Sequence, residues 1–161
     1  MIVLRQRLRR IRRSAVFAYA VAACATTALA ASADDEARAN LDRQTVQTVC
    51  GHCHTVDVFL NKPRSWARWN DVFADMTQRG ATGTDEQLTR VTRFFLENLT
   101  IVNVNSSPAE ELKWVLGIRD DVVEAILARR QRQPFANVAD LRSIPGVDSE
   151  KLEQRKSRIL F

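Results

Sequence analysis

Two cysteines and two histidines occur within five consecutive residues, Cys50-Gly51-His52-Cys53-His54. A zinc site needs four ligands, usually from two separated pairs, and the rest of the chain offers no second pair of Cys or His. A thioredoxin-like dithiol lies within a βαβ pattern, and no strand-rich pattern surrounds this stretch. A disulfide between Cys50 and Cys53 stays open as an alternative, but it gives His54 no role.

The pattern Cys-x-x-Cys-His is the attachment signature of c-type haem. Its two thiols bond to the two vinyl groups of the porphyrin, and the adjoining histidine then lies beneath the iron. We therefore predict one covalent haem c on Cys50 and Cys53, with His54 as an axial iron ligand. The same five residues also occur by chance in unrelated proteins. An export signal strengthens the interpretation, because haem is attached outside the cytoplasm.

Residues 1–33 have the three parts of a secretory signal: a basic segment, an apolar run and small residues before a charge step. They hold six arginines and no acid; subtracting these from the 24 Lys and Arg leaves 18 against 19 Asp and Glu, a net charge of −1. The overall charge of +5 therefore belongs to the leader and does not indicate a nucleic-acid partner. The apolar run is short and alanine-rich, which favours a cleaved peptide over a permanent span.

A second cleavage site competes with the ordinary one. Val21-Ala22-Ala23-Cys24 matches a bacterial lipobox, which would leave a lipid anchor on Cys24. Cleavage after Ala30 or Ala33 is the other interpretation. Both predict an exported, periplasmic protein without a membrane span after processing.

Met76 is the candidate for the sixth iron ligand, because removal of the leader leaves no other methionine. His52 lies inside the attachment loop and cannot reach the opposite face of a haem. Four side chains at i, i+3, i+4 and i+7 predict one face of a helix that packs on the haem, namely Trp69, Val72, Phe73 and Met76. Ser65 caps the start of this helix and Gly80 ends it. The alternatives are that Met76 is only a core residue and that the site binds water or is open.

Helical patterns flank the motif on both sides. Residues 35–50 lead into it, with apolar positions at Leu41, Val46 and Val49. Thr84 and Gln87 form a capping box that opens a helix ending at Leu99. The predicted buried stripe of that helix is Leu88, Val91, Phe94 or Phe95, and Leu99.

Residues 34–100 resemble short class I cytochrome c domains, and similar segments occur in haem subunits of quinohaemoprotein dehydrogenases. The resemblance is carried by the Cys-x-x-Cys-His motif, Trp69 to Phe73, Met76 and Gly80-Ala81. It implies a small helical haem domain that exchanges single electrons with redox partner proteins. The chain shows no nucleophile paired with a base, so we expect an electron carrier and not an enzyme.

The last 61 residues contain one pattern twice: helix, apolar-Gly-apolar turn, helix. The turns are Leu116-Gly117-Ile118 and Ile144-Pro145-Gly146-Val147. The predicted helices are 108–115, opened by a capping box of Ser107 and Glu110, then 120–131, 137–142, which Asn137 starts, and one from Asp148. The predicted fold is therefore all-α, with a cytochrome c-like domain at 34–100 and a tandem helix-hairpin-helix domain at 101–161.

Residues 101–161 resemble the helix-hairpin-helix domain of the competence DNA receptor ComEA, through VNVNSSPAEEL, Gly117-Ile118, QPFANVADL and IPGV. In DNA-binding members each hairpin reads apolar-Gly-apolar-Gly, and the second glycine lets the backbone approach a phosphate. Here Arg119 and Asp148 replace the second glycines. The candidate partner-binding positions are Gly117, Ile118, Arg119, Gly146 and Val147.

Charge disfavours DNA as the partner of this domain. Residues 101–161 hold ten Lys and Arg against nine Asp and Glu, a net charge of +1, whereas DNA binding depends on neutralising phosphates. Asp148, Asp120 and Asp121 are expected N-caps that would fill the helix amides. The same fold occurs in an extrinsic photosystem subunit, where it resembles a protein-docking module.

Three hypotheses follow. The leading one is an exported monohaem c-type electron carrier with a helix-hairpin-helix docking module. The second is a DNA-binding or DNA-uptake accessory protein of the ComEA type. The third is the haem subunit of a periplasmic quinohaemoprotein dehydrogenase.

Overall fold

The computed structural model describes residues 33–161, so the predicted secretory signal and its Cys24 lie outside the described residues. The chain divides into two compact units, residues 1–41 and 42–161. In the first unit, the described residues 33–41 are helical and carry an ion pair between Arg38 and Asp35 at 3.8 Å. No helix within residues 33–161 is long and apolar enough to cross a membrane.

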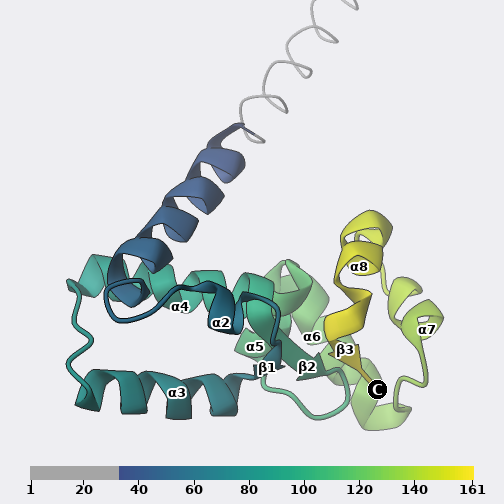
Figure 1. The fold of residues 1–161 in the computed structure, drawn as a ribbon. Helices are drawn as coiled ribbons and strands as arrows, with labels where there is room; N and C mark the ends of the chain where they lie inside the picture. The colour runs from purple at the N-terminus through teal and green to yellow at the C-terminus, as the bar shows by residue number, and fades with distance from the viewer. Residues whose placement is uncertain (1–32) are drawn as a thin grey trace, which may run out of the picture. The chain divides into compact units, whose positions relative to one another are not determined.

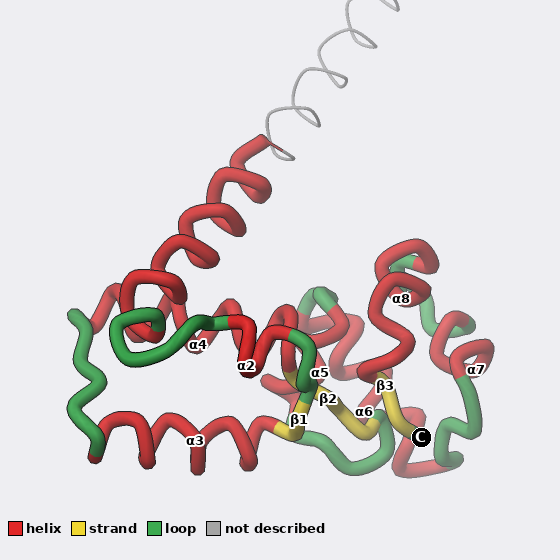
Figure 2. Tube along the Cα trace, viewed as in Figure 1, coloured by secondary structure: helices red, strands yellow, loops and turns green. Residues whose placement is uncertain are grey.

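The second unit is mostly helical and contains one small sheet (Figures 1 and 2). The helix that occupies residues 33–50 is followed by α2 (Asp57–Leu60), β1 (Arg64–Ser65), α3 (Trp66–Gln78), α4 (Asp85–Leu99) and β2 (Thr100–Asn103). The remaining elements are α5 (Ala109–Leu116), α6 (Asp120–Arg132), α7 (Val138–Arg142), α8 (Ser149–Arg155), the 3₁₀ turn η1 (Lys156–Arg158) and β3 (Ile159–Leu160). The all-α prediction is correct for the helices and misses the sheet.

The sheet has the order β1-β2-β3, and its neighbouring strands run parallel. Arg64 lies opposite Thr100 and Val102 lies opposite Ile159, so segments far apart in sequence meet on β2. The outer strands are two residues long and β2 is four. Such short strands leave no alternation that a sequence pattern can detect.

One core cluster is built by residues 46–50, α2, α3 and α4, and its buried members are Val46, Trp69, Val91, Phe94, Phe95 and Leu99. The ring of Phe95 is central. Its centroid lies 4.8 Å from the ring centroid of Trp69, 4.9 Å from that of Phe73 and 5.1 Å from that of Phe59. Trp69 Nε1 donates a hydrogen bond to the Leu99 carbonyl at 3.0 Å, which joins α3 to the end of α4. Leu41 and Leu88, expected in the apolar stripes, are instead 44% and 45% exposed.

The second core cluster belongs to α5–α8 and the adjoining strands. Its buried members are Val102, Val104, Leu112, Val115, Leu116, Val122, Ile126, Phe135, Leu141, Ile144, Leu152 and Ile159. Arg158 donates from Nη2 to the Glu97 carbonyl at 2.7 Å and from Nη1 to the Thr100 carbonyl at 3.0 Å. Burial lowers the pKa of Arg158 to about 10, so the guanidinium remains charged at neutral pH. It connects the C-terminal end of this cluster to the end of α4.

Four predicted caps are confirmed. Ser65 accepts from the Arg68 amide, Thr84 and Gln87 form the capping box of α4, and Asn137 and Asp148 cap α7 and α8. The capping box of Ser107 and Glu110 is wrong, because α5 begins at Ala109 with Pro108 at the cap position. The Ser107 hydroxyl instead accepts from the Asn103 amide at 3.1 Å.

Candidate functional site

The five-residue motif occupies the turn at the end of the first described helix. The Gly51 amide donates to the Gln47 carbonyl at 3.0 Å, and a Cβ at position 51 would lie 2.3 Å from that oxygen. Only glycine fits there without moving the backbone. Cys50 is half-buried, Cys53 is exposed, and both thiols are free. Burial raises the pKa of the Cys50 thiol, which keeps it protonated beside the apolar cluster.

The imidazole of His54 is exposed and has one nitrogen engaged. Its Nδ1 lies 3.0 Å from the carbonyl oxygen of Thr55. A carbonyl oxygen can only accept, so this contact places a proton on Nδ1, and in the neutral ring Nε2 then keeps a lone pair that can bind a metal. Backbone contacts of this kind orient metal-binding histidines. Within residues 33–161, no three His, Cys, Asp or Glu side chains are grouped so that they could hold a metal ion.

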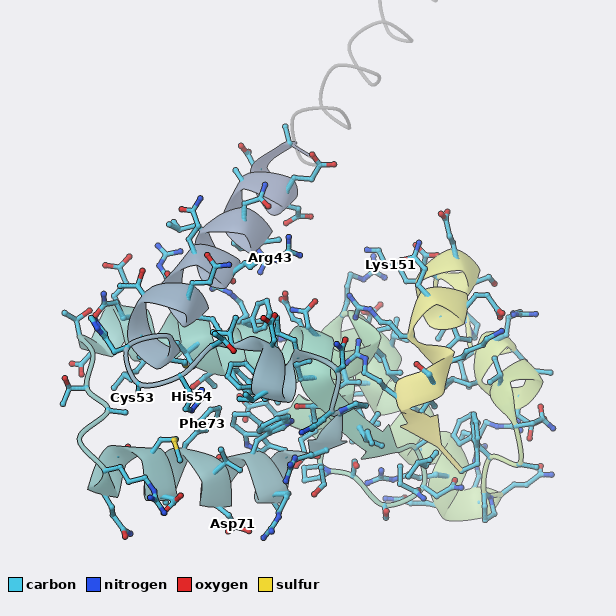
Figure 3. The ribbon with its side chains drawn as sticks, in the orientation of Figure 1. Arg43, Cys53, His54, Asp71, Phe73 and Lys151 are labelled. Carbon is cyan, nitrogen blue, oxygen red and sulfur yellow. The ribbon has the colours of Figure 1, made fainter. Side chains whose placement is uncertain are left out.

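A partly exposed apolar surface adjoins the motif. Seven half-buried side chains pack on the same core cluster as Cys50, namely Val49, Val56, Phe59, Leu60, Trp66, Val72 and Phe73. In the view of Figure 3, Cys53, His54 and Phe73 lie on the side of the attachment loop that faces α3. Of the three side chains predicted to pack on the haem, Val72 and Phe73 are half-buried and keep exposed surface. The third, Trp69, is only 1% exposed.

Met76 lies on α3, one turn after Val72 and Phe73, and is half-buried. Its carbonyl accepts from the amides of Arg79 and Ala81, so it marks the last turn of the helix. Its role as the sixth ligand stays a prediction.

Asp42 fixes the helix that leads into the motif, a feature that sequence patterns do not reveal. Its side chain is 2% exposed and accepts two hydrogen bonds of 2.6 Å from Arg93 Nε and Nη2. Arg90 Nη1 adds a third contact at 3.4 Å. These bonds raise the pKa of the Arg93 guanidinium. The bidentate pair attaches the helix to α4 two turns before Cys50.

The first glycine of each hairpin has a structural role. Gly117 and Gly146 have positive φ angles of 65° and 88°, which side-chain-bearing residues rarely adopt. A Cβ at position 117 would lie 2.5 Å from Nη1 of Arg155, which donates to the Val115 carbonyl at 2.9 Å. The Arg155 guanidinium therefore covers this turn and neutralises the carbonyl end of α5.

Arg119 and Asp148, which stand where DNA-binding hairpins have their second glycine, differ in how they cap the helix that follows. Asp148 Oδ1 accepts from the amides of Glu150 at 2.9 Å and Lys151 at 3.1 Å, as predicted, so these amides are occupied. Arg119, and not an aspartate, is the cap residue of α6, and it forms no side-chain cap bond. The expected N-cap roles of Asp120 and Asp121 are therefore wrong, because the helix begins at Asp120 itself. Asp121 pairs with Arg119 at 2.7 Å, which lowers the pKa of its carboxyl group.

Most basic side chains of residues 101–161 already have partners. Three donate to backbone carbonyls, namely Arg130, Arg155 and Arg158. Five lie within ion-pair distance of carboxylates, namely Lys113, Arg119, Arg129, Arg142 and Lys156. Of the ten basic residues described in this range, only Arg132 and Lys151 have neither kind of partner. Little positive charge is left for phosphates.

The comparisons with known proteins bear on the C-terminal part. A family model described as helix-hairpin-helix motif matches residues 97–160, which is less than half of the chain and includes both hairpins. The helix-hairpin-helix prediction is thereby confirmed, and the match is compatible with DNA binding. No curated protein and no solved structure shows a significant match. No comparison supports a cytochrome c domain in residues 34–100, so the haem site stays a prediction.

Proposed function

We propose that this chain carries one haem c at Cys50, Cys53 and His54 and transfers single electrons between exported partner proteins. The observation that carries the proposal is the arrangement of the motif: two free thiols three residues apart, followed by an imidazole with a lone pair on Nε2. This donor set fits a covalent haem. Neither the family match nor the other comparisons contribute to it.

Each residue has a distinct task in the proposed site. The two thiols hold the porphyrin, His54 binds the iron, and the half-buried side chains of Val72 and Phe73 cover apolar ring surface. Bound haem c supplies a one-electron couple that needs no catalytic side chain. The protein's contribution is to fix the ligand, and Asp42 does so at a distance by holding the preceding helix to α4.

The proposal is tested by producing the full chain in a host with a haem-attachment system. The purified protein should keep its colour on a denaturing gel, because thioether bonds survive unfolding. The double variant Cys50→Ser/Cys53→Ser should be colourless. A wild-type protein without covalent haem would overturn the proposal.

Met76→Ala tests the sixth ligand separately. With a thioether on the iron, the oxidised protein should show the weak red absorption band typical of methionine-ligated haem. The variant should lose this band and its reduction potential should fall, because methionine ligation raises the potential. Covalent haem should be retained in full. An unchanged band and potential would mean that another group, or none, occupies the sixth position.

A DNA-binding role is the second candidate, and the match to the helix-hairpin-helix motif is the observation that favours it. The occupied amides at α8 and the paired basic residues oppose it. We expect no gel shift of duplex DNA at about 10 mM ionic strength, where the Debye length of about 30 Å leaves charge attraction strong. The double variant Arg119→Gly/Asp148→Gly, which restores both second glycines, is the informative comparison. A wild-type shift that disappears with rising salt would establish DNA binding instead.

A further inference from the structure

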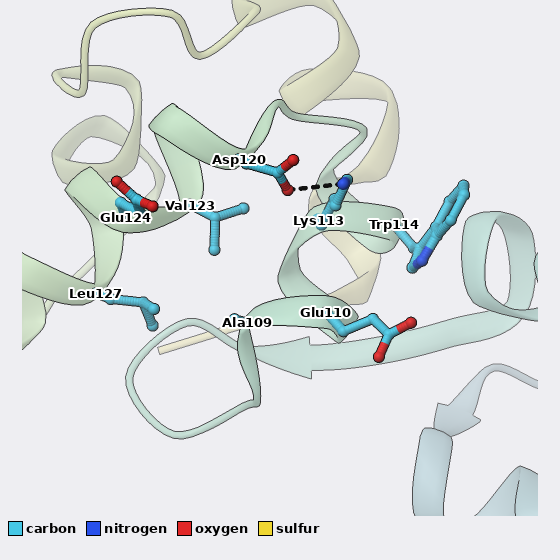
Figure 4. Close-up of a pocket in the computed structure, with 8 residues that line it drawn as sticks. All are labelled: Ala109, Glu110, Lys113, Trp114, Asp120, Val123, Glu124 and Leu127. Carbon is cyan, nitrogen blue, oxygen red and sulfur yellow. Dashed lines mark ion pairs between the residues drawn. The ribbon is translucent and has the colours of Figure 1, made fainter.

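A groove of about 550 Å³ opens between α5 and α6 of the helix-hairpin-helix region (Figure 4). Its lining consists of Ala109, Glu110, Lys113, Trp114, Asp120, Val123, Glu124 and Leu127. The groove contains none of the hairpin glycines and none of the attachment residues. It is therefore distinct from the attachment motif, and it adjoins the first hairpin through Asp120.

The lining combines apolar side chains with an excess of acid. Trp114 and Leu127 are half-buried, and Val123 is 4% exposed. Figure 4 shows Val123 and Leu127 projecting from α6 towards α5, with Trp114 at one end of the groove. The groove is open to solvent and is lined by apolar and charged side chains in equal number, so it can receive a side chain from a partner's surface.

The charges in the groove are not balanced. Lys113 Nζ lies 2.6 Å from Asp120 Oδ1, so this cation is already paired. Glu110 and Glu124 are exposed, and neither carboxylate has an ion-pair or hydrogen-bond partner in the described part of the chain. Three acids thus face one base, with one acid on α5 and two on α6. The net negative charge repels a nucleic acid and attracts a cation.

We propose that this groove binds a segment of a partner protein in which a lysine or arginine is flanked by an apolar residue. The aliphatic stem of the basic side chain and its apolar neighbour pack against the half-buried Trp114 and Leu127. The cationic head group pairs with Glu110 or Glu124, whose unpaired carboxylates lie on opposite sides of the groove, and Trp114 offers an indole face for a cation–π contact. Charge complementarity selects this occupant over an acidic segment or DNA.

The test uses the full chain as purified, whether or not it carries haem, and a fluorescein-labelled peptide of alternating leucine and lysine or arginine. The control peptide has glutamate in place of each basic residue. Fluorescence anisotropy should show binding of the basic peptide only, with affinity that falls as salt rises. Amide chemical-shift changes on ¹⁵N-labelled protein should lie within residues 109–127.

Two variants separate the groove from general surface charge. Glu110→Gln/Glu124→Gln removes both unpaired carboxylates at exposed positions without disturbing the fold, and should weaken binding about tenfold. Glu150→Gln removes an equally exposed acid on α8, outside the groove, and should leave the affinity unchanged. Trp114→Phe keeps an aromatic ring at this position and should therefore weaken binding less than Trp114→Ala.

Three outcomes would overturn this inference: equal binding of the acidic peptide, equal losses in the groove and α8 variants, or shift changes outside residues 109–127. Competition by duplex DNA at the same residues would assign the groove to nucleic acid instead. The haem proposal has its own readout, because colour on a denaturing gel does not depend on peptide binding. Either proposal can therefore fail alone.

Discussion

The variant His54→Ala should lose the absorption spectrum of haem with an axial imidazole, whereas His52→Ala should keep it. Both histidines lie in the same turn and both are exposed, so neither substitution removes a buried contact. They differ in position relative to Cys53: His54 follows it directly, and its Nδ1 is held by the Thr55 carbonyl at 3.0 Å, which leaves Nε2 for the iron. A comparison of the two variants therefore separates the loss of an iron ligand from any general effect on the fold.

The measurement is the spectrum of reduced protein, together with haem stain per amount of chain on a denaturing gel. His54→Ala should shift the visible bands and reduce the yield of attached haem several-fold, since the iron no longer anchors the porphyrin beside the thiols. His52→Ala should match the wild type in both readouts. Identical behaviour of the two variants would remove His54 from the site, even if the thiols still carried haem.

Asp42→Asn should cost about 3 kcal/mol of unfolding free energy. The substitution keeps the shape of the side chain but removes the charge that Arg93 contacts through two bonds of 2.6 Å. Breaking a buried ion pair from one side leaves an uncompensated charge, which typically costs 3–5 kcal/mol. We take the lower end because the side chains of Arg93 and Arg90 are 22% exposed and can recover some hydration.

Urea unfolding of the two proteins gives this difference directly, and Asp71→Asn is the matched control. Asp71 pairs with Arg68 at 3.3 Å, but both side chains are more than 60% exposed. Its loss should cost below about 1 kcal/mol, as exposed pairs usually do. Equal effects of the two substitutions would mean that the Asp42 pair does not hold the helix. A large effect should be accompanied by faster hydrogen exchange at the Gly51 amide, which bonds to the same helix.

Local signals predicted the helices well, and long-range contacts account for what was missed. Ser65, Thr84, Asn137 and Asp148 act within three residues of their own positions, so the sequence alone reveals them as caps. Ser107 has the same local pattern but bonds to Asn103, because the chain turns there to enter α5. The sheet was missed because each of its pairings joins residues that lie dozens of positions apart.

The candidate site also combines local features, which the sequence reveals, with long-range contacts, which it does not. The motif from Cys50 to His54 is contiguous, so its chemistry could be predicted without any knowledge of the fold. Asp42 and Arg93, which position that motif, are 51 residues apart and carry no shared pattern. The groove beside Trp114 was also invisible in sequence, since it depends on the angle at which α5 and α6 meet across Gly117.

The position of β2 between two partners has a practical consequence for anyone designing fragments of this protein. A cut after residue 100, where one region resembles a cytochrome and the next a hairpin module, passes through the central strand. Each fragment would then present unpaired backbone groups along an edge that invites self-association. The N-terminal piece would also lose the guanidinium of Arg158 that satisfies carbonyls at the end of α4. Isolated halves that precipitate would reflect this severed strand and not the intrinsic instability of either half.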